Sequence, residues 1–499
     1  MKRIVLLVIV IILGTGIAQA KGDLIWDYQS DKFIKDVIKG NTSVITGKTS
    51  IIDYKDQEKI DKEVSENLDI DLINTNLAEC LKVASDNNYT LKQNKSIKEQ
   101  AYWSYKNANA QYLPDFQYSY SIQKLSGTFL VGGIQVDSVN ETPIMNTFTF
   151  SWPTLNQGKT IFLNIQKKNE YRAKSSSLNY SQDEVLLNTT LTYYELLRQK
   201  IKFDVFRTNL IDRREQLNFT KARFQVGLGD KLDVERAEAE VAKAKQQYIA
   251  SFNSIRLLQA KLANIMGVDV LDALYPYEVY IETRMLIDEK YSIEDLYQMA
   301  LVARDDIKAS KLMIESLKAQ RNSVKMDFAP QVNLLYQKAW AGTARLGLYP
   351  NDTIGFSLTA PLGKKFGFDT VTNVKALGAQ IEAEQYKLEI LQRNVKENIT
   401  TSYYNSKTSL ERIEAAKKEV EASDESLKIS IVQMTVGKST FLDVIQAQGI
   451  KVQSRQNLVD SIIDYNKAQV QLLFDAGIIT CASVLKNYET PQVKQNKAP

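Results

Sequence analysis

Two hydrophobic periods follow one another along this chain. Around residues 115–123, apolar Phe116 and Tyr118 alternate with polar Gln117 and Ser119, and the same period of two returns in three later segments. Strict alternation predicts a β-strand with one apolar and one polar face. The sequence therefore predicts four strands, at about 115–123, 146–152, 331–337 and 353–360, with Pro153 ending the second.

Longer segments carry apolar residues at spacings of three and four. Residues 155–222 contain no proline and predict one helix of about 68 residues, which would reach roughly 100 Å. After Gly227, a heptad stripe predicts a second helix that ends at Gly267. Two long helices joined by a short glycine turn predict a coiled-coil hairpin.

This hairpin occurs twice, 210 positions apart (437 − 227). The pattern Val-Gly-x-x-x-x-Leu-Asp-Val begins at Val226 and again at Val436. A repeat of this period indicates two copies of one structural unit. We therefore divide most of the chain into a first repeat at 71–270, a linker at 271–292 and a second repeat at 293–478. The offset also relates Tyr193-Tyr194 to Tyr403-Tyr404, and we expect both pairs to pack in helix seams.

The two ends of the chain differ from the repeats. Residues 1–20 combine a basic start, an apolar run and Ala18-Gln19-Ala20, a pattern typical of a cleaved signal peptide. An uncleaved membrane anchor is the alternative for this segment. Residues 21–70 are polar and predict an extended N-terminal arm, and residues 479–499 predict a polar, disordered tail.

Composition excludes several kinds of function. Lys and Arg number 63 against 59 Asp and Glu, so the net charge of +4 gives no basis for nucleic-acid binding. The chain contains no His, which removes Ser-His-Asp catalysis and His-ligated metals. We expect no cofactor and no enzymatic activity, although Asp305-Asp306 offers a carboxylate pair for acid–base chemistry as an alternative. Cys80 and Cys481 are the only cysteines, and whether they form a disulfide stays open.

Four amphipathic strands are too few to close a membrane barrel, which needs about eight. Several chains would have to combine their strands, and their helices would pack side by side around the same axis. The expected fold is mainly α: a tube of long coiled-coil helices continuous with a shared β-barrel. A fibrous coiled-coil surface protein, such as an adhesin, is the alternative, although it does not explain strands set between long helices.

Several motifs recur together in this chain: both Val-Gly…Leu-Asp-Val turns, Leu77 to Asn88 followed by Leu113-Pro114, Trp152-Pro153, Tyr193-Tyr194, Arg304-Asp305-Asp306, Gly267 and Gly477. With these motifs, the chain resembles the TolC-like outer-membrane efflux protein family over residues 72 to 478. It departs from the family where many relatives have Asn-Pro and Arg-Pro-Asp, here Asn88-Tyr89 and Arg304-Asp305.

The resemblance implies a homotrimer in the outer membrane of a Gram-negative bacterium. Its twelve-stranded β-barrel would contact outer-membrane lipid, and its α-barrel would extend into the periplasm. Such a channel passively exports drugs, small molecules or proteins in tripartite efflux or type I secretion. An inner-membrane pump of the RND or ABC type would supply the cargo and the energy through a periplasmic adaptor protein.

The resemblance also places functional residues at the periplasmic tip. Asp443 aligns with an acidic residue of the closed entrance, and a ring of three copies would attract cations. Gln446 stands where some relatives have a second Asp, and Met434 and Ser439 stand where they have a locking Tyr and Arg. Asp233 is the counterpart of Asp443 in the first repeat. Both carboxylates have an alternative role as first-turn residues that stabilise a helix dipole.

Two further sets of residues complete the predicted sites. The first is expected to dock the adaptor, although its glycines could serve only the turn backbone. The second is expected to face lipid or form an aromatic belt, with a soluble β-core as the alternative. The docking set is Val226, Gly227, Leu228, Gly229, Val436, Gly437 and Lys438, and the lipid-facing set is Phe148, Phe150, Trp152, Tyr336, Trp340 and Phe356.

Overall fold

The computed structural model describes residues 72–131, 134–156, 158–276, 278, 282–288, 290–343, 347–360 and 364–486. The predicted signal peptide and the N-terminal arm lie outside the described residues, as do residues 487–499 of the predicted tail. The chain divides into two compact units. Of the described residues, the first unit comprises those within 72–89, 182–303 and 396–486, and the second comprises those within 90–181 and 304–395.

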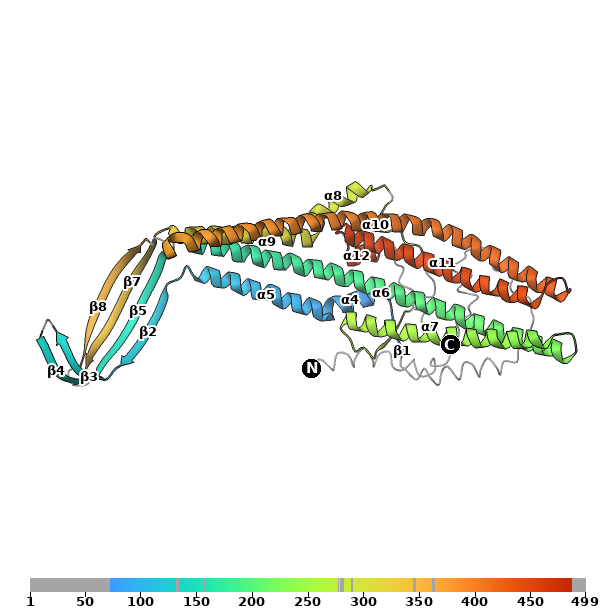
Figure 1. The fold of residues 1–499 in the computed structure, drawn as a ribbon, viewed down its shortest axis with the longest axis horizontal. Coiled ribbons are helices and arrows are strands. Elements are labelled where there is room, and N and C mark those ends of the chain that lie inside the picture. The colour runs from blue at the N-terminus through green and yellow to red at the C-terminus, as the bar shows by residue number, and fades with distance from the viewer. Residues whose placement is uncertain are drawn as a thin grey trace, which may run out of the picture. The chain divides into compact units, whose positions relative to one another are not determined.

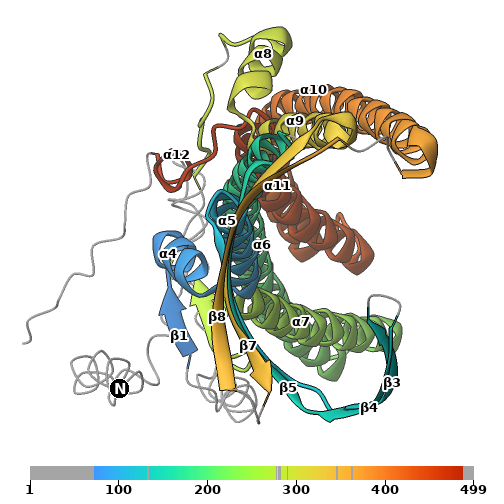
Figure 2. The same ribbon diagram turned by 90° about the vertical axis from the view of Figure 1, so that its left-hand side faces the viewer.

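The second unit is built on an antiparallel four-stranded sheet in the order β2-β5-β7-β8. The sheet is visibly curved (Figure 2). A separate hairpin, β3–β4, lies between β2 and β5 in sequence. The strands are β2 (Asp115–Ile122), β3 (Leu125–Val131), β4 (Ile134–Glu141), β5 (Pro143–Asn156), β7 (Gln331–Thr343) and β8 (Gly347–Thr359).

The strands differ from the sequence prediction in two respects. β5 does not end at Pro153 but continues to Asn156, because a register shift between Trp152 and Leu155 takes the proline out of the ladder. Proline lacks an N–H and is accommodated in a strand at such bulges. The β3–β4 hairpin lies between the first two predicted strands, in a segment where no strand is predicted from the sequence.

Helices complete the second unit. They are α5 (Tyr89–Ala110), α9 (Asp305–Lys325) with the 3-10 turn η1 (Met326–Phe328), the 3-10 turn η2 (Lys364–Gly367), and parts of α6 (Lys159–Gln225) and α10 (Phe368–Thr435). A small apolar core joins α9 to α10, where Ile314 and Leu317 pack with Ile381 and Leu388.

The first unit contains two helical hairpins (Figure 1). One joins α6 to α7 (Lys231–Met266), and the other joins α10 to α11 (Phe441–Asp475). The remaining elements are α4 (Leu77–Asn87), α8 (Ile293–Ala303), α12 (Cys481–Val484) and the parallel strand pair β1 (Leu72–Thr75) and β6 (Ala273–Pro276). None of the helices in the described ranges combines the length and hydropathy of a bilayer-crossing helix.

The helices of the first unit meet along seams of different chemistry. Between α6 and α7, the ring of Phe203 stacks on Tyr248 at 4.9 Å and also contacts Phe252. Between α6 and α11 the contact is ionic: Arg198 reaches Asp464 at 2.5 Å and Asp460 at 3.5 Å. The heptad pattern predicts the apolar seam, whereas the ionic seam joins residues more than 260 positions apart.

The linker between the repeats is attached to α11 by two amide side chains. Gln469 Oε1 accepts the backbone N–H groups of Leu286 and Ile287, both at 3.0 Å. Asn466 accepts the N–H of Arg284 at 2.9 Å and donates to the carbonyl of Glu282 at 2.8 Å. A segment without regular secondary structure thus has its backbone groups paired by a helix.

The two repeats are not equivalent in burial. Tyr193 and Tyr194 are buried in the first unit, as expected for seam residues. Their counterpart Tyr404 is 57% exposed, so the prediction that both tyrosine pairs pack in seams is wrong for Tyr404. The first residues of the predicted disordered tail are ordered. Ile479 and Val484 are buried, and Thr480 caps α12 with a capping box.

Candidate functional site: the hairpin tips and the aromatic sheet face

Each hairpin turns at a glycine in the left-handed conformation. Gly227 has φ 76° and Gly437 has φ 74°, a region that residues with a Cβ rarely adopt. The next residue closes the turn in the same way in both repeats: the N–H of Leu228 donates to Arg223 O at 2.9 Å, and that of Lys438 donates to Gln433 O at 2.8 Å. This is the Schellman ending of a helix, and it explains why the repeat preserves the glycine.

The residue after Leu228 in the first turn, and after Lys438 in the second, distinguishes the two turns. At Gly229 a Cβ would lie 3.0 Å from the backbone N of Phe224, so a side chain there would be tightly packed and its neighbours would have to shift by a few tenths of an ångström. The second repeat has Ser439 here, and its hydroxyl donates to Asp443 Oδ2 at 2.9 Å. The two turns therefore share a backbone conformation but differ in the side-chain interactions at this position.

The helices that follow the turns are capped differently. Asp230 caps α7 by accepting the N–H of Leu232 at 3.1 Å. In α11, Thr440 and Asp443 form a capping box: the Thr440 N–H donates to Asp443 Oδ2 at 2.8 Å, and the Asp443 N–H donates to the Thr440 hydroxyl at 3.3 Å. The alternative role of Asp443, a first-turn carboxylate, is thus present in the structure.

The capping box also fixes the charge of Asp443. Hydrogen bonds from Thr440, and then from Ser439, hold the pKa of this carboxyl below its ordinary value. Asp443 and Gln446 are both exposed on α11. Asp233 is half-buried, and its Oδ1 lies 3.7 Å from Arg236 Nη1. The two aligned carboxylates therefore differ in their partners, and Asp443 is the more accessible.

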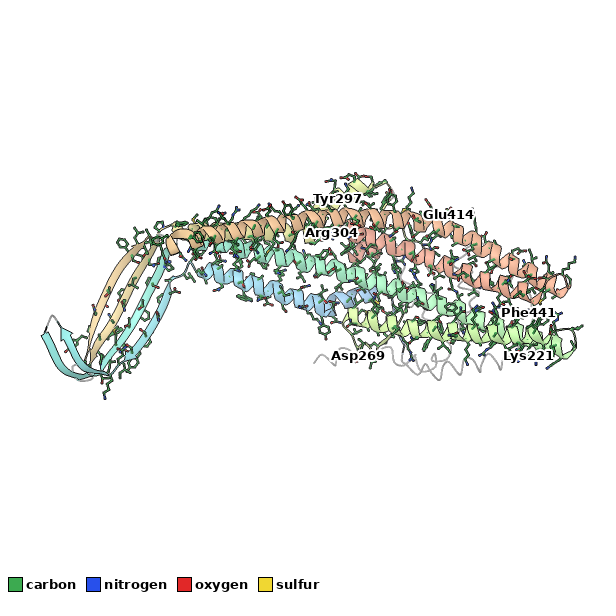
Figure 3. All side chains as sticks on the ribbon, viewed as in Figure 1. Lys221, Asp269, Tyr297, Arg304, Glu414 and Phe441 are labelled. Atoms are coloured by element: carbon green, nitrogen blue, oxygen red, sulfur yellow. The ribbon has the colours of Figure 1, made fainter. Side chains whose placement is uncertain are left out.

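A cleft of about 750 Å³ opens where the two tips meet. Its lining comes from both hairpins: the first contributes aromatic, basic and acidic residues, and the second contributes both apolar and hydroxyl-bearing residues. Lys221 and Phe441 mark the ends of the two hairpins in Figure 3. The lining residues are Phe219, Thr220, Arg223, Phe224, Gly227, Leu228, Gly229, Asp230, Lys231, Asp233, Arg236, Met434, Gly437, Ser439, Thr440, Phe441 and Leu442.

The turns expose apolar side chains beside this cleft. Leu228 is 70% exposed, Val226 is 69% exposed and Val436 is 62% exposed. Isolated exposed apolar residues are ordinary, but several gathered at one end of a fold mark an interaction surface. Met434, at the position of a locking tyrosine in some relatives, is instead buried with Leu427, Val444 and Ala447.

Sequence reasoning missed the aromatic lining of the cleft. Phe219, Phe224 and Phe441 lie within about two helical turns of the repeated glycines, but none of them is repeated at the offset of 210. Their positions next to a recognised turn were the available signal. These residues line one cleft because the two hairpin tips lie together. Local sequence patterns do not predict that arrangement of the tips.

The strand register gathers the predicted aromatic residues on one face of the sheet. Phe116 pairs with Phe150, Phe150 with Tyr336, and Tyr336 with Ile354, so these four side chains share one row. Residues two positions apart on a strand share a face. This places Phe148, Phe150, Trp152, Tyr336, Trp340 and Phe356 on the same side.

The opposite face of the sheet is mostly polar and small, although Met145, Leu335 and Tyr349 also lie on it. Its polar and small residues include Gln117, Ser119, Thr147, Thr149, Gln337, Ala339, Thr353 and Ser357. On the aromatic face, Phe356 is 74% exposed and Phe116 is 65% exposed, although Phe116 contacts Phe150 at 5.0 Å between ring centroids. The aromatic face is therefore not the covered core of a soluble sandwich in this chain.

The described part of the chain offers no group of three or more His, Cys, Asp or Glu side chains that could hold a metal ion. Cys80 and Cys481 are both free thiols, the first buried and the second exposed. Burial raises the pKa of the Cys80 thiol to about 12, so this thiol is held in its unreactive protonated form.

Comparison with known proteins gives one consistent result. The model of the family described as "Outer membrane efflux protein" matches residues 81–268 and 296–477. Outer membrane protein TolC of Vibrio cholerae is 22% identical over 82% of this chain and 92% of its own length. The alkaline protease secretion protein AprF of Pseudomonas aeruginosa is 21% identical, and the match spans 59% of this chain and 62% of AprF.

The fold is shared with solved channels as well. The outer membrane channel CmeC of Campylobacter jejuni superposes with a TM-score of 0.73 at 17% identity, covering 80% of this chain and 85% of CmeC. The predicted fold class, long helices combined with strands in two repeats, is therefore confirmed.

Proposed function

Because this chain belongs to the outer membrane efflux protein family, we propose that three copies of it form one duct joined to an inner-membrane pump through a periplasmic adaptor protein. The chain is an outer-membrane channel protein of efflux or secretion. The trimer, the adaptor and a pump of the RND or ABC type are the parts that we add. The pump provides the energy, and the duct is passive.

The observation that carries this proposal is the one-sided sheet. A face of mainly aromatic and aliphatic residues, interrupted by the Lys338–Asp352 ion pair and backed mainly by Ser, Thr and Gln, suits a wall between lipid and water. β2 and β8 are the edges of the sheet, and edge strands present unpaired backbone groups that lipid cannot satisfy. Pairing β8 of one copy with β2 of the next would close the sheet, and three copies would give twelve strands.

We place the entrance of the duct at the hairpin tips. Three copies of Asp443 would form a ring of carboxylates, held ionised by their own capping boxes, and such a ring favours cations. Gln446 is exposed one turn further along α11 and would line the same passage, whereas Asp233, paired with Arg236, would contribute less.

The tip cleft is the proposed adaptor site. Its walls include the docking residues Gly227, Leu228, Gly229 and Gly437, and Val226, Val436 and Lys438 lie in the same turns. A helical hairpin of the adaptor would cover the exposed apolar side chains and insert between the two tips. Phe219, Phe224 and Phe441 in the lining of the cleft support an apolar contribution to this contact beside the ionic one.

Single-channel recording in a planar bilayer tests the duct. Purified full-length protein should give discrete, cation-selective openings. Asp443→Asn, which keeps a carbonyl oxygen for the Thr440 N–H, should lower cation selectivity, and Asp233→Asn should change it less. Protein shown to be inserted that never conducts, in the wild type or either variant, would oppose the proposal.

The adaptor site is tested in the native cell envelope. A photo-crosslinking amino acid at position 228 should capture a periplasmic protein with a coiled-coil hairpin. The same probe at position 271, where Leu271 is 85% exposed outside the cleft, serves as the matched control. Identical adducts from both positions, or none from position 228, would oppose docking at the tip.

The rival reading, a fibrous coiled-coil surface protein, is not supported by any specific observation. It would require the apolar face of the sheet to be covered, and Phe116, Ile354 and Phe356 are 65%, 83% and 74% exposed.

A further inference from the structure

Two helix segments of the second unit carry an excess of positive charge. Residues 90–110 of α5 and residues 159–181 of α6 hold nine lysines and arginines but two acidic residues, Glu99 and Glu170. Glu170 is already paired with Lys167, at 2.8 Å. The whole chain is nearly balanced, with 63 basic and 59 acidic residues, so the excess is a local property of these segments.

α5 and α6 lie side by side in this region (Figure 1). Asn94 Nδ2 donates to Ser181 Oγ at 2.6 Å, and Asn109 is hydrogen-bonded to Asn164 nearer the sheet. These two contacts fix an antiparallel register, because α5 runs towards the sheet and α6 runs away from it. The middle of α5 therefore lies level with residues 168–172 of α6.

Four aromatic rings meet at that level. Tyr171 of α6 lies 5.5 Å from Tyr102 and 6.4 Å from Tyr105 between ring centroids. Trp103 meets Tyr102 edge to face at 5.4 Å and is itself 61% exposed. An exposed Trp held by neighbouring rings is typical of a binding surface, because a rigid ring loses little conformational entropy on contact.

Three exposed cations surround these rings. Lys106 follows Tyr102 by one helical turn, and its Nζ lies 5.4 Å from the centre of that ring. Lys168 precedes Tyr171 by one turn, and Arg172 follows Lys168 by one turn, so both flank the rings from α6. We call this set of rings and cations the α5–α6 patch: Tyr102, Trp103, Lys106, Lys168, Tyr171 and Arg172.

The exposed stripe on α6 indicates which side of the duct wall the patch occupies. It begins next to the sheet with Ile161 and Ile165, which are 54% and 42% exposed, and it continues with Lys168 and Arg172 at spacings of three and four. Exposed isoleucines beside the sheet suit the side of its aromatic face, where they would meet lipid, and not the side of a water-filled passage. The patch therefore belongs to the outer surface of the wall.

The patch extends beyond the reach of a membrane headgroup layer. At about 1.5 Å per residue, Lys168 and Arg172 lie roughly 14 and 20 Å along α6 from its start beside the sheet. The headgroup layer of one leaflet is only about 5–8 Å thick. The ligand that fits this surface is therefore an anionic component of the periplasm and not a lipid of the bilayer.

We propose that the α5–α6 patch binds peptidoglycan, the carboxylate-bearing glycan of the periplasm. The C–H faces of its sugar rings lie against Trp103 and Tyr102, whose ring faces carry partial negative charge. The free carboxylates of its peptide stems pair with Lys106, Lys168 and Arg172. A ligand that combines sugars with carboxylates thus matches a surface that combines exposed rings with cations. This contact goes beyond export, since it holds the duct in the cell wall.

Co-sedimentation with isolated peptidoglycan sacculi tests the contact, using full-length protein in detergent. The wild type should pellet with the sacculi, and added salt should release it because the contact is partly ionic. The combined Lys106→Gln, Lys168→Gln and Arg172→Gln variant should bind many-fold more weakly, and Trp103→Ala should bind several-fold more weakly. Sacculi with amidated carboxylates should retain less of the wild type than untreated sacculi do.

A matched variant separates the patch from the overall charge of the protein. Lys407→Gln, Lys417→Gln and Lys418→Gln remove three charges from exposed positions on α10 in the first unit, and this variant should pellet as the wild type does. Equal losses in both triple variants would overturn the proposal, and so would undiminished binding of the patch variant. Single-channel recording distinguishes this failure from failure of the duct, because wild-type protein that conducts but does not pellet overturns the wall contact alone.

Photo-crosslinking in intact cells identifies the ligand directly. A photo-crosslinking amino acid at position 103 should give adducts of high and heterogeneous mass that a muramidase shortens, because the enzyme cuts the glycan. The same probe at position 404, where Tyr404 is 57% exposed, should give no muramidase-sensitive adduct. A discrete adduct at position 103 that resists the muramidase would overturn the proposal in favour of a protein partner, and the absence of any adduct there would also overturn it.

Discussion

Arg304 and Asp306 form a bidentate ion pair at the start of α9. The Nε of Arg304 donates to Asp306 Oδ1 at 3.1 Å, and its Nη2 donates to Oδ2 at 2.6 Å. The side chains are only 5% and 14% exposed. This carboxylate, considered from the sequence as part of an acid–base pair, is fully engaged in holding a helix start.

Asp306→Ala should destabilise the protein strongly, because it leaves a buried guanidinium without its carboxylate. Loss of one partner of a buried pair costs about 3–5 kcal/mol. Asp305→Ala is the matched control, since Asp305 pairs at 3.1 Å with the half-exposed Lys308 and should cost less than about 1 kcal/mol. Denaturant midpoints of the two variants in detergent measure both changes in stability. Equal losses of stability would contradict the assignment of Asp306 as the partner of the buried Arg304.

Replacing either turn glycine with alanine should destabilise its hairpin. A Cβ meets no atom at Gly227 or Gly437, so the cost arises from the positive φ alone and amounts to about 1–2 kcal/mol. Gly378→Ala and Gly449→Ala, in open positions within α10 and α11, should instead stabilise by up to about 1 kcal/mol. The same destabilising sign at all four positions in thermal unfolding would rule out this account.

The stabilising effect of Asp443 should depend on pH. Its folded pKa is lowered, by Thr440 first and then by Ser439, so its contribution is present above the ordinary pKa of 3.8 and is lost as pH falls through the lower folded value. The thermal midpoint of the wild type should exceed that of Asp443→Asn at neutral pH. The gap should narrow well below pH 3.8. A gap that stays constant in acid would show that the carboxylate charge does not support the cap.

The two cysteines should differ sharply in reactivity. Cys80 is fully buried with a pKa raised to about 12, whereas Cys481 is exposed. A thiol reagent at neutral pH should modify one thiol per folded chain and two in denaturant. Cys481→Ser should abolish labelling of the folded protein, and continued labelling would place Cys80 within reach of solvent.

Gln469→Leu should loosen the linker between the repeats. The substitution keeps most of the side-chain volume but leaves the N–H groups of Leu286 and Ile287 without an acceptor, at a cost of about 1–3 kcal/mol. Amide hydrogen exchange should accelerate at these residues, while exchange in the α7 core stays unchanged. Gln453→Leu, on an exposed part of α11, is the control.

Elements with strong periodicity were predictable from the sequence, and elements formed by distant pairing were not. The alternation of Phe116 to Ile122 specifies β2, and the glycines 227 and 437 specify the turns, because each signal is local. The four-residue strands β1 and β6 are too short to show a period, and they pair residues about 200 positions apart.

The candidate site also contains features that the sequence predicts and features that it does not. The tip residues follow from the repeated motif, but the capping box of Asp443 needs the hydroxyl of Thr440, and the aligned position in the first repeat is Asp230. The exposure of Tyr404 shows the same limit, since sequence identity between repeats does not fix what packs against each copy. A sequence repeat therefore predicts the backbone conformation of each copy better than it predicts which residues contact the side chains of that copy.

The different caps of the two turns have a consequence for stoichiometry. A trimer of this chain would present six helical tips, but of two chemical kinds: three with Gly229 and Asp230, and three with Ser439 and Thr440. Six identical partner subunits arranged around such an end would therefore meet alternating, inequivalent neighbours. They would bind as three pairs, and the two members of each pair would have different affinities, so the six would not form one equivalent set.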